Sequence, residues 1–258
     1  MSISPGTRSV LITGAADGIG RGIATTFARA GDRVALLDYD AGKLARTTEA
    51  LQAAGAEALA IQIDVRDAAA VRAAVDEVLG RHGRLDVAVS NAGIYPNKPV
   101  LELEEDEWDR VLDTNLKGTY LVTRAAARAM VARGEGGKIC AIASGAHQSG
   151  RIGAAHYCAS KAGLVLYARV LAMELAEHRI NVNVVSPGFV DVGEREGVSA
   201  RYRETISSTI PWGRTGRPDD IARAVFFLCS AEAEFITGAV LSVDGGSSAG
   251  RFHLPKSD

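Results

Sequence analysis

A tyrosine and a lysine four residues apart are the side chains of this chain best suited to acid–base chemistry. Tyr157 and Lys161 lie in the stretch His156–Lys161, and Ser144 lies thirteen residues before the tyrosine. Residues i and i+4 share one face of a helix, so the lysine ammonium is expected about one turn from the phenol. A positive charge there would lower the phenol's pKa from about 10 towards neutral pH, as acid–base catalysis requires. Ser144 could donate a hydrogen bond to a substrate oxygen. The same spacing also occurs on the outer face of ordinary amphipathic helices, so it needs support from the rest of the chain.

Three glycines near the N-terminus supply that support. Gly14, Gly18 and Gly20 follow the apolar stretch Val10–Thr13 and open a helical stretch. In a dinucleotide site the first glycine permits a tight turn, the second lets backbone approach the pyrophosphate, and the third allows close packing. The helix N-terminus then presents free N–H groups and a partial positive charge to the phosphates. This loop, which also contains Asp17 and Ile19, is therefore expected to bind a dinucleotide.

The charge at the end of the second apolar run indicates which dinucleotide. Asp38 closes that run eighteen residues beyond Gly20, where a carboxylate can accept hydrogen bonds from the adenosine ribose hydroxyls. It would repel the 2′-phosphate of NADP. Asp17 adds a second negative charge nearby, and neither it nor Tyr39 supplies a cation. The sequence therefore predicts NAD as cofactor rather than NADP, with a solvated turn carboxylate as the alternative role of Asp38.

Two later turns complete the predicted cofactor site. Asp64 and Val65 follow the third apolar run, where the carboxylate and the next N–H could bind the adenine edge. The small residues of Asn91-Ala92-Gly93 follow the fourth run and could let backbone pass close to a ribose. Each pair or triplet could also be an ordinary turn at the end of a strand.

The elements that must position these groups alternate along the chain. Seven apolar runs read as strands: Ser9–Thr13, Arg33–Asp38, Glu57–Gln62, Leu85–Ser90, Lys138–Ala143, Ile180–Val185 and Ala239–Val243. Helical stretches lie between them, among them Gly20–Ala30, Trp108–Arg133 and Tyr157–His178. This alternation predicts an α/β fold: one doubly wound Rossmann-type domain over residues 1–258, with a mostly parallel seven-stranded sheet and helices on both faces. A polar segment at about 192–212 is expected to carry a short helix and to act as a substrate lid, or to be a surface insertion, and residues 250–258 are expected to form a tail.

Composition excludes several other classes of protein. The 258 residues carry a formal net charge of −2, and no block of like charge suggests a nucleic-acid or membrane surface. There is no apolar run of about 18 residues, and the first nine residues lack the apolar core of a signal peptide. The three cysteines are odd in number and lack C-x-x-C spacing. We therefore expect reduced thiols, no metal site and a cytoplasmic location.

Together these motifs resemble the short-chain dehydrogenase/reductase family, in its single-domain type of about 250 residues. The likeness rests on TGxxxGxG at Thr13–Gly20, Asn91-Ala92-Gly93, Asn115, Ser144, YxxxK at Tyr157–Lys161, Pro187-Gly188, and the ending Val243-Asp244-Gly245-Gly246. It extends over nearly the whole chain.

The resemblance implies a role for each of these residues. Tyr157 would donate or accept the proton, Lys161 would lower its pKa and bind the nicotinamide ribose, and Ser144 would hold the reacting oxygen. Asn115 would fix a water that links Lys161 to solvent. Pro187, Gly188 and Val190 would border the nicotinamide. Relatives of this type are mostly homotetramers that pair helices such as Trp108–Arg133 and Tyr157–His178, and the same assembly is expected here.

The residues expected around the substrate are mostly polar. His147, Arg151 and Phe189 would join Ser144 and Tyr157, with His156 nearby and Arg195, Arg201 and Arg203 in the lid. Such a pocket favours a small polar alcohol or carbonyl compound, such as a sugar, polyol or sugar acid, over a steroid or acyl chain. We therefore expect an NAD-dependent alcohol or sugar dehydrogenase. Two alternatives remain: a reductase acting on a 3-oxoacyl thioester of acyl carrier protein, and a non-catalytic NAD-binding sensor or scaffold.

Overall fold

The computed structural model describes residues 8–193 and 200–250, and of residues 200–203 it describes the backbone alone. Within them lies one parallel sheet with the strand order β3-β2-β1-β4-β5-β6-β7. The strands are β1 (Ser9–Thr13), β2 (Arg33–Asp38), β3 (Ala58–Gln62), β4 (Val87–Ser90), β5 (Gly137–Ile142), β6 (Ile180–Pro187) and β7 (Val240–Val243). The order reverses between β1 and β4, as in Rossmann-type folds. The predicted fold class is confirmed, and β6 continues two residues further than expected.

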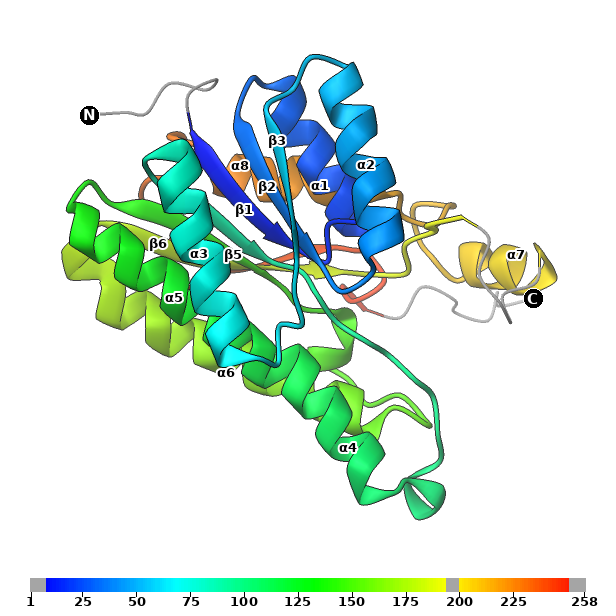
Figure 1. Cartoon of the computed structure of the whole chain (residues 1–258). Coiled ribbons are helices and arrows are strands. Elements are labelled where there is room, and N and C mark those ends of the chain that lie inside the picture. Colours follow the sequence, from blue (N-terminus) through cyan, green and yellow to red (C-terminus); the bar gives the residue numbers. More distant parts are fainter. Residues whose placement is uncertain (1–7, 194–199, 251–258) are drawn as a thin grey trace, which may run out of the picture.

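Helices cover both faces of this sheet (Figure 1). The layer on one face is formed by α1 (Gly18–Arg29), α2 (Ala41–Ala53) and α8 (Pro218–Leu228), and the layer on the other by α3 (Ala68–His82), α5 (Gly118–Arg133) and α6 (Ala155–Leu175). The remaining helices are α4 (Glu105–Leu112), which packs on α6, and α7 (Ala200–Ser208), which follows β6.

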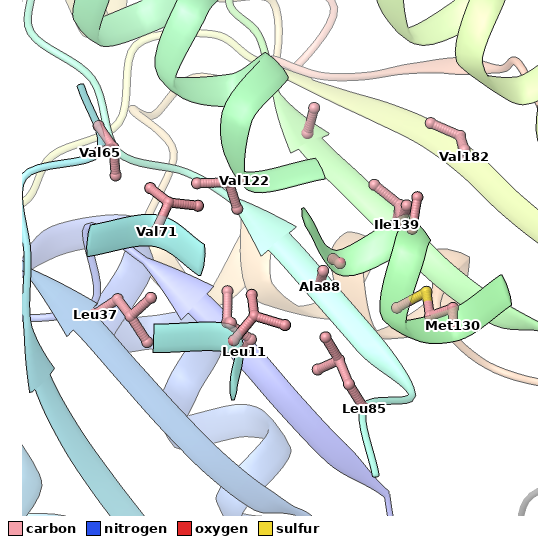
Figure 2. Packing of buried hydrophobic residues seen from close by; sticks show 14 of the residues in the cluster. Leu11, Leu37, Val65, Val71, Leu85, Ala88, Val122, Met130, Ile139 and Val182 are labelled. Carbon is pink, nitrogen blue, oxygen red and sulfur yellow. The ribbon is translucent and has the colours of Figure 1, made fainter. Parts of the chain in front are cut away.

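The inner strands β1, β2 and β4 are largely apolar because they are buried from both sides. Along β1, Val10 and Ile12 join the core under α1, α2 and α8, while Leu11 between them joins the core under α3, α5 and α6. Figure 2 shows Leu11 in this second core, which also includes Val71 of α3 and Val122 of α5. Successive side chains of a strand point to opposite faces, so a strand between two helical layers needs apolar residues at every position.

The helix predicted over Trp108–Arg133 is divided in the structure. After α4 the chain forms a π-helical turn, Asp113–Lys117, before α5 begins at Gly118. A π-turn carries one residue more than an α-helical turn, and such turns are frequent at functional sites. The spacing of apolar residues does not reveal one extra residue, which explains why the prediction was wrong here. The turn contains Asn115, whose side chain is fully buried.

The short helix expected in the polar segment at about 192–212 is α7. Residues 194–199 of that segment, including Arg195, lie outside the described residues, as do the side chains of Arg201 and Arg203. Residues 251–258 of the expected tail also lie outside them. No helix in the described part of the chain has both the length and the apolar character needed to cross a membrane.

Candidate active site

The residues singled out in the sequence gather at one edge of the sheet. The glycine loop follows β1, Asp38 ends β2, Asn91 follows β4, Ser144 follows β5 by two residues, and Pro187 ends β6. All strands run in the same direction, so these carboxyl ends meet at a common edge. Ligands of doubly wound sheets bind at this edge, next to the point where the strand order reverses.

The loop after β1 requires glycine for reasons of space and conformation. Gly14 and Gly18 have φ angles of 63° and 55°, a region that favours glycine. A Cβ on Gly20 would lie 1.9 Å from the Gly14 carbonyl oxygen, so no side chain fits there. Asp17 caps α1, and its carboxylate accepts a hydrogen bond from the Gly18 N–H at 2.7 Å. The free N–H groups of α1 therefore begin at the place where a pyrophosphate is expected.

The loop after β4 braces the glycine loop. The Asn91 amide donates to the carbonyl oxygens of Thr13 and Gly14, both at 3.0 Å. In return the Thr13 hydroxyl accepts from the N–H groups of Asn91 at 3.0 Å and Ala92 at 3.1 Å. The Asn91 side chain is thus hydrogen-bonded to backbone, while the backbone of Asn91-Ala92-Gly93 is the part expected to pass close to a ribose. The contribution of the side chain is to hold two strand ends in register.

Asp38 and the residues of α2 hold the same loop from the other side. One carboxylate oxygen of Asp38 accepts from the Ala16 N–H and the other from the Asp40 N–H, each at 3.0 Å. The Thr47 hydroxyl of α2 donates to the Ala16 carbonyl at 2.8 Å. Tyr39, next to Asp38, is 73% exposed. The predicted ribose carboxylate is therefore fixed in place at the cofactor edge.

A cation that the sequence analysis missed lies in this region. The Lys43 ammonium of α2 lies 3.1 Å from the Asp17 carboxylate. The negative charge that Asp17 adds beside Asp38 is therefore paired with a cation on α2. The two residues are 26 positions apart in the chain, so only the packing of α2 against the loop reveals the pair.

The turn after β3 is built around a local ion pair. The Arg66 Nε atom donates to both oxygens of the Asp64 carboxylate, at 3.0 and 2.9 Å, and its Nη2 atom donates to one of them at 2.6 Å. These bonds hold the pKa of that carboxyl below its usual value. The Val65 side chain is buried against Gly118. A Cβ on Gly118 would lie only 2.8 Å from a methyl carbon of Val65, so glycine is needed at that position. The predicted adenine-binding pair is thus anchored at the start of α5.

Tyr157 and Lys161 lie on the first turns of α6 and face the same side. The Lys161 ammonium is 5.8 Å from the centre of the Tyr157 ring, which confirms the geometry expected from their spacing. Lys161 is almost fully buried and donates to the Ile142 carbonyl at the end of β5, at 2.8 Å. Burial lowers the pKa of the Lys161 ammonium to about 8.

The pKa of the Tyr157 phenol departs from the expectation in direction. Burial raises it, while the Ser144 hydroxyl beside the phenol and the positive charge of Arg151 act in the opposite direction. The Arg151 guanidinium lies 5.6 Å from the ring centre. The spacing of Tyr157 and Lys161 indicates a neighbouring ammonium but not the loss of water around the phenol, and desolvation prevails in this structure.

Asn115 is held beside the lysine by the π-helical turn. Its side-chain oxygen accepts from the Ile94 N–H and its amide donates to the Ile94 carbonyl, both at 2.8 Å, with a further bond of 3.2 Å to the Ser160 hydroxyl. A Cβ on Gly93 would lie 3.1 Å from the Asn115 oxygen and 3.6 Å from the Lys161 ammonium. Gly93 therefore lets Asn115 and Lys161 approach the strand end together.

Some of the residues expected around the substrate are exposed, and others are buried or hydrogen-bonded within the protein. Arg151 is exposed, and Tyr95 meets the Tyr157 ring edge-on with 6.2 Å between ring centres. His147 is half-buried, with its Nδ1 atom 2.8 Å from the Ser144 carbonyl and 3.3 Å from the Ser186 hydroxyl. His156 is fully buried, so it does not line the pocket as expected.

The residues after β6 border this site from the other side. A Cβ on Gly188 would lie 2.7 Å from the Asp244 Cβ atom, so the glycine permits close contact with the turn after β7. Val190 forms an isolated bridge with Gly216, and Phe189 before it is half-buried. Over the described residues, no cluster of histidine, cysteine or carboxylate side chains has the arrangement of a metal site.

Comparisons with known proteins agree with this geometry. A family model described as enoyl-(acyl carrier protein) reductase matches residues 14–248. The chain is 37% identical to a sorbitol dehydrogenase of Cereibacter sphaeroides, over 93% of this chain and 97% of that protein. It is 40% identical to a 3-oxoacyl-(acyl-carrier-protein) reductase of Staphylococcus aureus, over 93% and 98%. A crystal structure of a short-chain type dehydrogenase/reductase from Mycobacterium marinum superposes with a TM-score of 0.86 at 36% identity, covering 94% of this chain and 96% of that one.

Proposed function

Because the chain belongs to the short-chain dehydrogenase/reductase family, we propose that it is an NAD-dependent oxidoreductase acting on a small polar alcohol or carbonyl compound. The observation that carries the proposal is the position of Tyr157, with Lys161 on the same face of α6 and the Ser144 hydroxyl beside the phenol. This group lies at the sheet edge that also holds the glycine loop and Asp38. A non-catalytic sensor would not need it.

Each side chain has a separate task in this proposal. Tyr157 takes the proton from the substrate hydroxyl during oxidation and returns it during reduction. Ser144 donates a hydrogen bond that holds the reacting oxygen next to the phenol. Lys161, positioned by Ile142 and neighboured by Asn115, supplies positive charge that favours the phenolate. The glycine loop and Asp38 would hold NAD, which would supply the acceptor for the hydride of the carbinol carbon.

The chain's own residues fit a dinucleotide. Side chains on Gly14 or Gly20 would collide with Asn91 and with the loop backbone, so the glycines let the loop fold tightly at the start of α1, where phosphates are expected. The fixed carboxylate of Asp38 is suited to two ribose hydroxyls and opposes a 2′-phosphate. Initial rates with NAD and NADP at matched concentrations test this preference, and equal kcat/KM for the two would contradict it.

We propose a polyol, sugar or sugar acid as the substrate. Arg151 and His147 near the phenol favour a hydroxylated or anionic compound, and the likeness to a sorbitol dehydrogenase points in the same direction. The direct experiment measures NAD reduction at 340 nm across a panel of polyols, aldoses, sugar acids and hydroxy acids. Turnover of long-chain alcohols alone would refute the substrate class.

Arg151 provides a sharper test of the anionic substrates. Replacing it with glutamine should raise KM for sugar acids about tenfold and leave KM for neutral polyols nearly unchanged, because the guanidinium would pair with a carboxylate. Removing its charge should also raise the pKa of Tyr157 further, which slows oxidation near neutral pH. KM measured for gluconate and sorbitol in parallel checks the split, and an equal rise for both would show that Arg151 only shapes the pocket.

A second candidate is reduction of a 3-oxoacyl thioester. The 40% identity to a 3-oxoacyl-(acyl-carrier-protein) reductase and the acyl-carrier description of the matching family model favour it. The same Tyr157 would then donate its proton to the carbonyl oxygen. Oxidation of NADH or NADPH with acetoacetyl-coenzyme A, compared with the polyol panel, separates the two candidates. Saturable NAD binding without turnover of any compound would instead favour the sensor.

We also propose that the protein assembles as a homotetramer through α5 and α6. Exposed apolar side chains follow one face of α6 at helical spacing, with Leu166 63%, Val170 42% and Met173 72% exposed, and Tyr120 of α5 is 40% exposed. A row of this kind is typical of a surface that another chain covers. Light scattering of the purified protein should give the mass of four chains, and a mass of one chain would contradict the proposal.

A further inference from the structure

One buried side chain near the active site has polar atoms that the described part of the chain leaves without partners. His156, the second residue of α6, is fully buried, and neither of its ring nitrogens has a hydrogen-bond partner among the described residues. Buried polar atoms are hydrogen-bonded in the large majority of cases, so this exception calls for an explanation. The reaction proposed above gives His156 no task.

The surroundings of His156 oppose a positive charge on its ring. Two charged groups of α4, Glu107 and Arg110, act on the imidazole. Burial lowers the pKa of the imidazole below its ordinary value, and Arg110 acts in the same direction, while Glu107 acts against both. The charge of Glu107 is partly neutralised by Lys98 at 3.1 Å. The partial positive charge at the N-terminus of α6 also disfavours an imidazolium there.

The helix that covers His156 is connected to the active site at both ends. After α4 the chain forms the π-helical turn that contains Asn115, whose amide donates to the Ser160 hydroxyl of α6. Before α4, the Lys98 N–H donates at 2.7 Å to the carbonyl oxygen of Gly153, just ahead of α6. Figure 1 shows α4 at the edge of the molecule, away from the sheet. A displacement of α4 would therefore reach Asn115 and leave the sheet intact.

We propose that His156 is an acid-sensitive contact: when its imidazole takes up a proton, α4 separates from the start of α6 and Asn115 loses its fixed position. An imidazolium has two N–H donors and needs acceptors or water for both, which only the separated helices would offer. Because the pKa of the packed imidazole is lowered, the separated form binds the proton at a higher pH than the packed form. The packed form is thus favoured above the ordinary pKa of 6.5 and is lost as pH falls below it.

Trp108 of α4 can report on this contact without any turnover. The chain has two tryptophans, so Trp212→Phe leaves Trp108 as the only one. In that background, Trp108 fluorescence should change reversibly between about pH 7.5 and about pH 5, while the far-ultraviolet circular dichroism stays that of the folded protein. The rate at which NADH reduces the most active carbonyl compound should fall about tenfold over the same range, although protonation of Tyr157 alone would not lower it. Only this second readout rests on the proposed function.

Replacing the imidazole with a group that does not titrate should remove both effects. His156→Phe keeps a ring of similar size in the buried position, and His156→Met is a second, more flexible replacement if the phenylalanine does not fit. The matched control is His82→Gln. His82 of α3 is also buried with a lowered pKa, but its ring is 2.8 Å from the Ser9 hydroxyl, and a glutamine amide can keep that bond. This control should retain the acid-induced changes of the unaltered protein.

Three results would overturn the inference. The first is no change in Trp108 fluorescence on acidification, and the second is a change that persists in both His156 variants. The third is a loss of circular dichroism in step with the fluorescence, because acid would then unfold the whole protein instead of moving α4. A fluorescence change that depends on His156, found in a protein that reduces no carbonyl compound at any pH, would support this inference and refute the proposed function.

Discussion

Replacing Tyr157 with phenylalanine should lower kcat about 10³-fold and leave the affinity for NAD nearly unchanged. The phenylalanine ring keeps the edge contact with Tyr95, so the shape of the site is retained. What is lost is the only atom of that side chain that can carry a proton. Steady-state rates and calorimetric NAD binding, measured on the same preparation, separate the two effects.

A matched control lies on the same helix. Tyr167 of α6 also has a partly buried hydroxyl, which lies 2.8 Å from the Thr123 hydroxyl of α5. Tyr167→Phe makes the same chemical change away from the sheet edge and should retain most of the activity. Comparable losses in the two variants would mean that removing any hydroxyl from α6 disturbs the protein, and the assignment of Tyr157 as acid and base would fall.

The pH dependence of the reaction rates of the unaltered protein is a further test of Tyr157 as the acid and base. Oxidation requires the phenolate, and burial raises the pKa of Tyr157. The rate of oxidation should therefore rise with pH through the neutral range, while reduction, which uses the protonated phenol, should fall as pH passes that pKa. Tyr157→Phe should lose this pH dependence along with its activity.

Lys161→Met should have opposite effects on activity and stability. Activity should fall about 10²-fold, because the phenolate loses its neighbouring positive charge. Stability at pH 7 should rise, because burial lowers the pKa of the ammonium from its ordinary 10.5 to about 8 and charging it in the folded protein is costly. Removing that cost should raise the free energy of unfolding by about 3 kcal/mol. Losing the hydrogen bond to the Ile142 carbonyl should lower it by about 1 kcal/mol.

The gain in stability should depend on pH in a defined way. Below about pH 8 the unaltered lysine is charged in both the folded and the unfolded chain, so the cost is fully present and the methionine variant gains most. Between about pH 8 and 10.5 the unfolded chain binds more protons than the folded one, so the free energy of unfolding of the unaltered protein rises with pH and the difference closes. Urea unfolding of both proteins at about pH 7 and about pH 10 measures the difference in stability where it should be largest and where it should be small. A variant less stable at pH 7 would show that the ammonium is well solvated.

The spacing of residues along the sequence predicted those parts of the structure that depend on neighbours in the chain. The glycine loop follows β1 as expected, and Lys161 faces Tyr157 because four residues make one helical turn. Apolar runs located all seven strands of the described sheet to within two residues. The inner strands gave the clearest signal, since strands buried on both faces are apolar at nearly every position.

What the sequence did not reveal depends on groups brought together from far apart. Lys43 meets Asp17 only when α2 packs on the glycine loop, and Asn91 reaches Thr13 only when β4 pairs with β1. The pKa of Tyr157 follows from how much water the surrounding elements exclude, which spacing does not report. The π-helical turn at Asn115 adds one residue to a helix whose apolar pattern continues across it.

The strand order has a consequence for how the chain is made. β1 emerges first and becomes an inner strand of the sheet, β2 and β3 extend one side, and β4 to β7 are then added one after another to the other side. Until β7 is in place, the growing chain always presents an unpaired apolar strand to its surroundings, which is a hazard for aggregation. The glycine loop is translated early, whereas Ser144 and Tyr157 follow only after more than half of the chain has been made. A nascent chain therefore exposes an unpaired apolar edge until β7 pairs with β6.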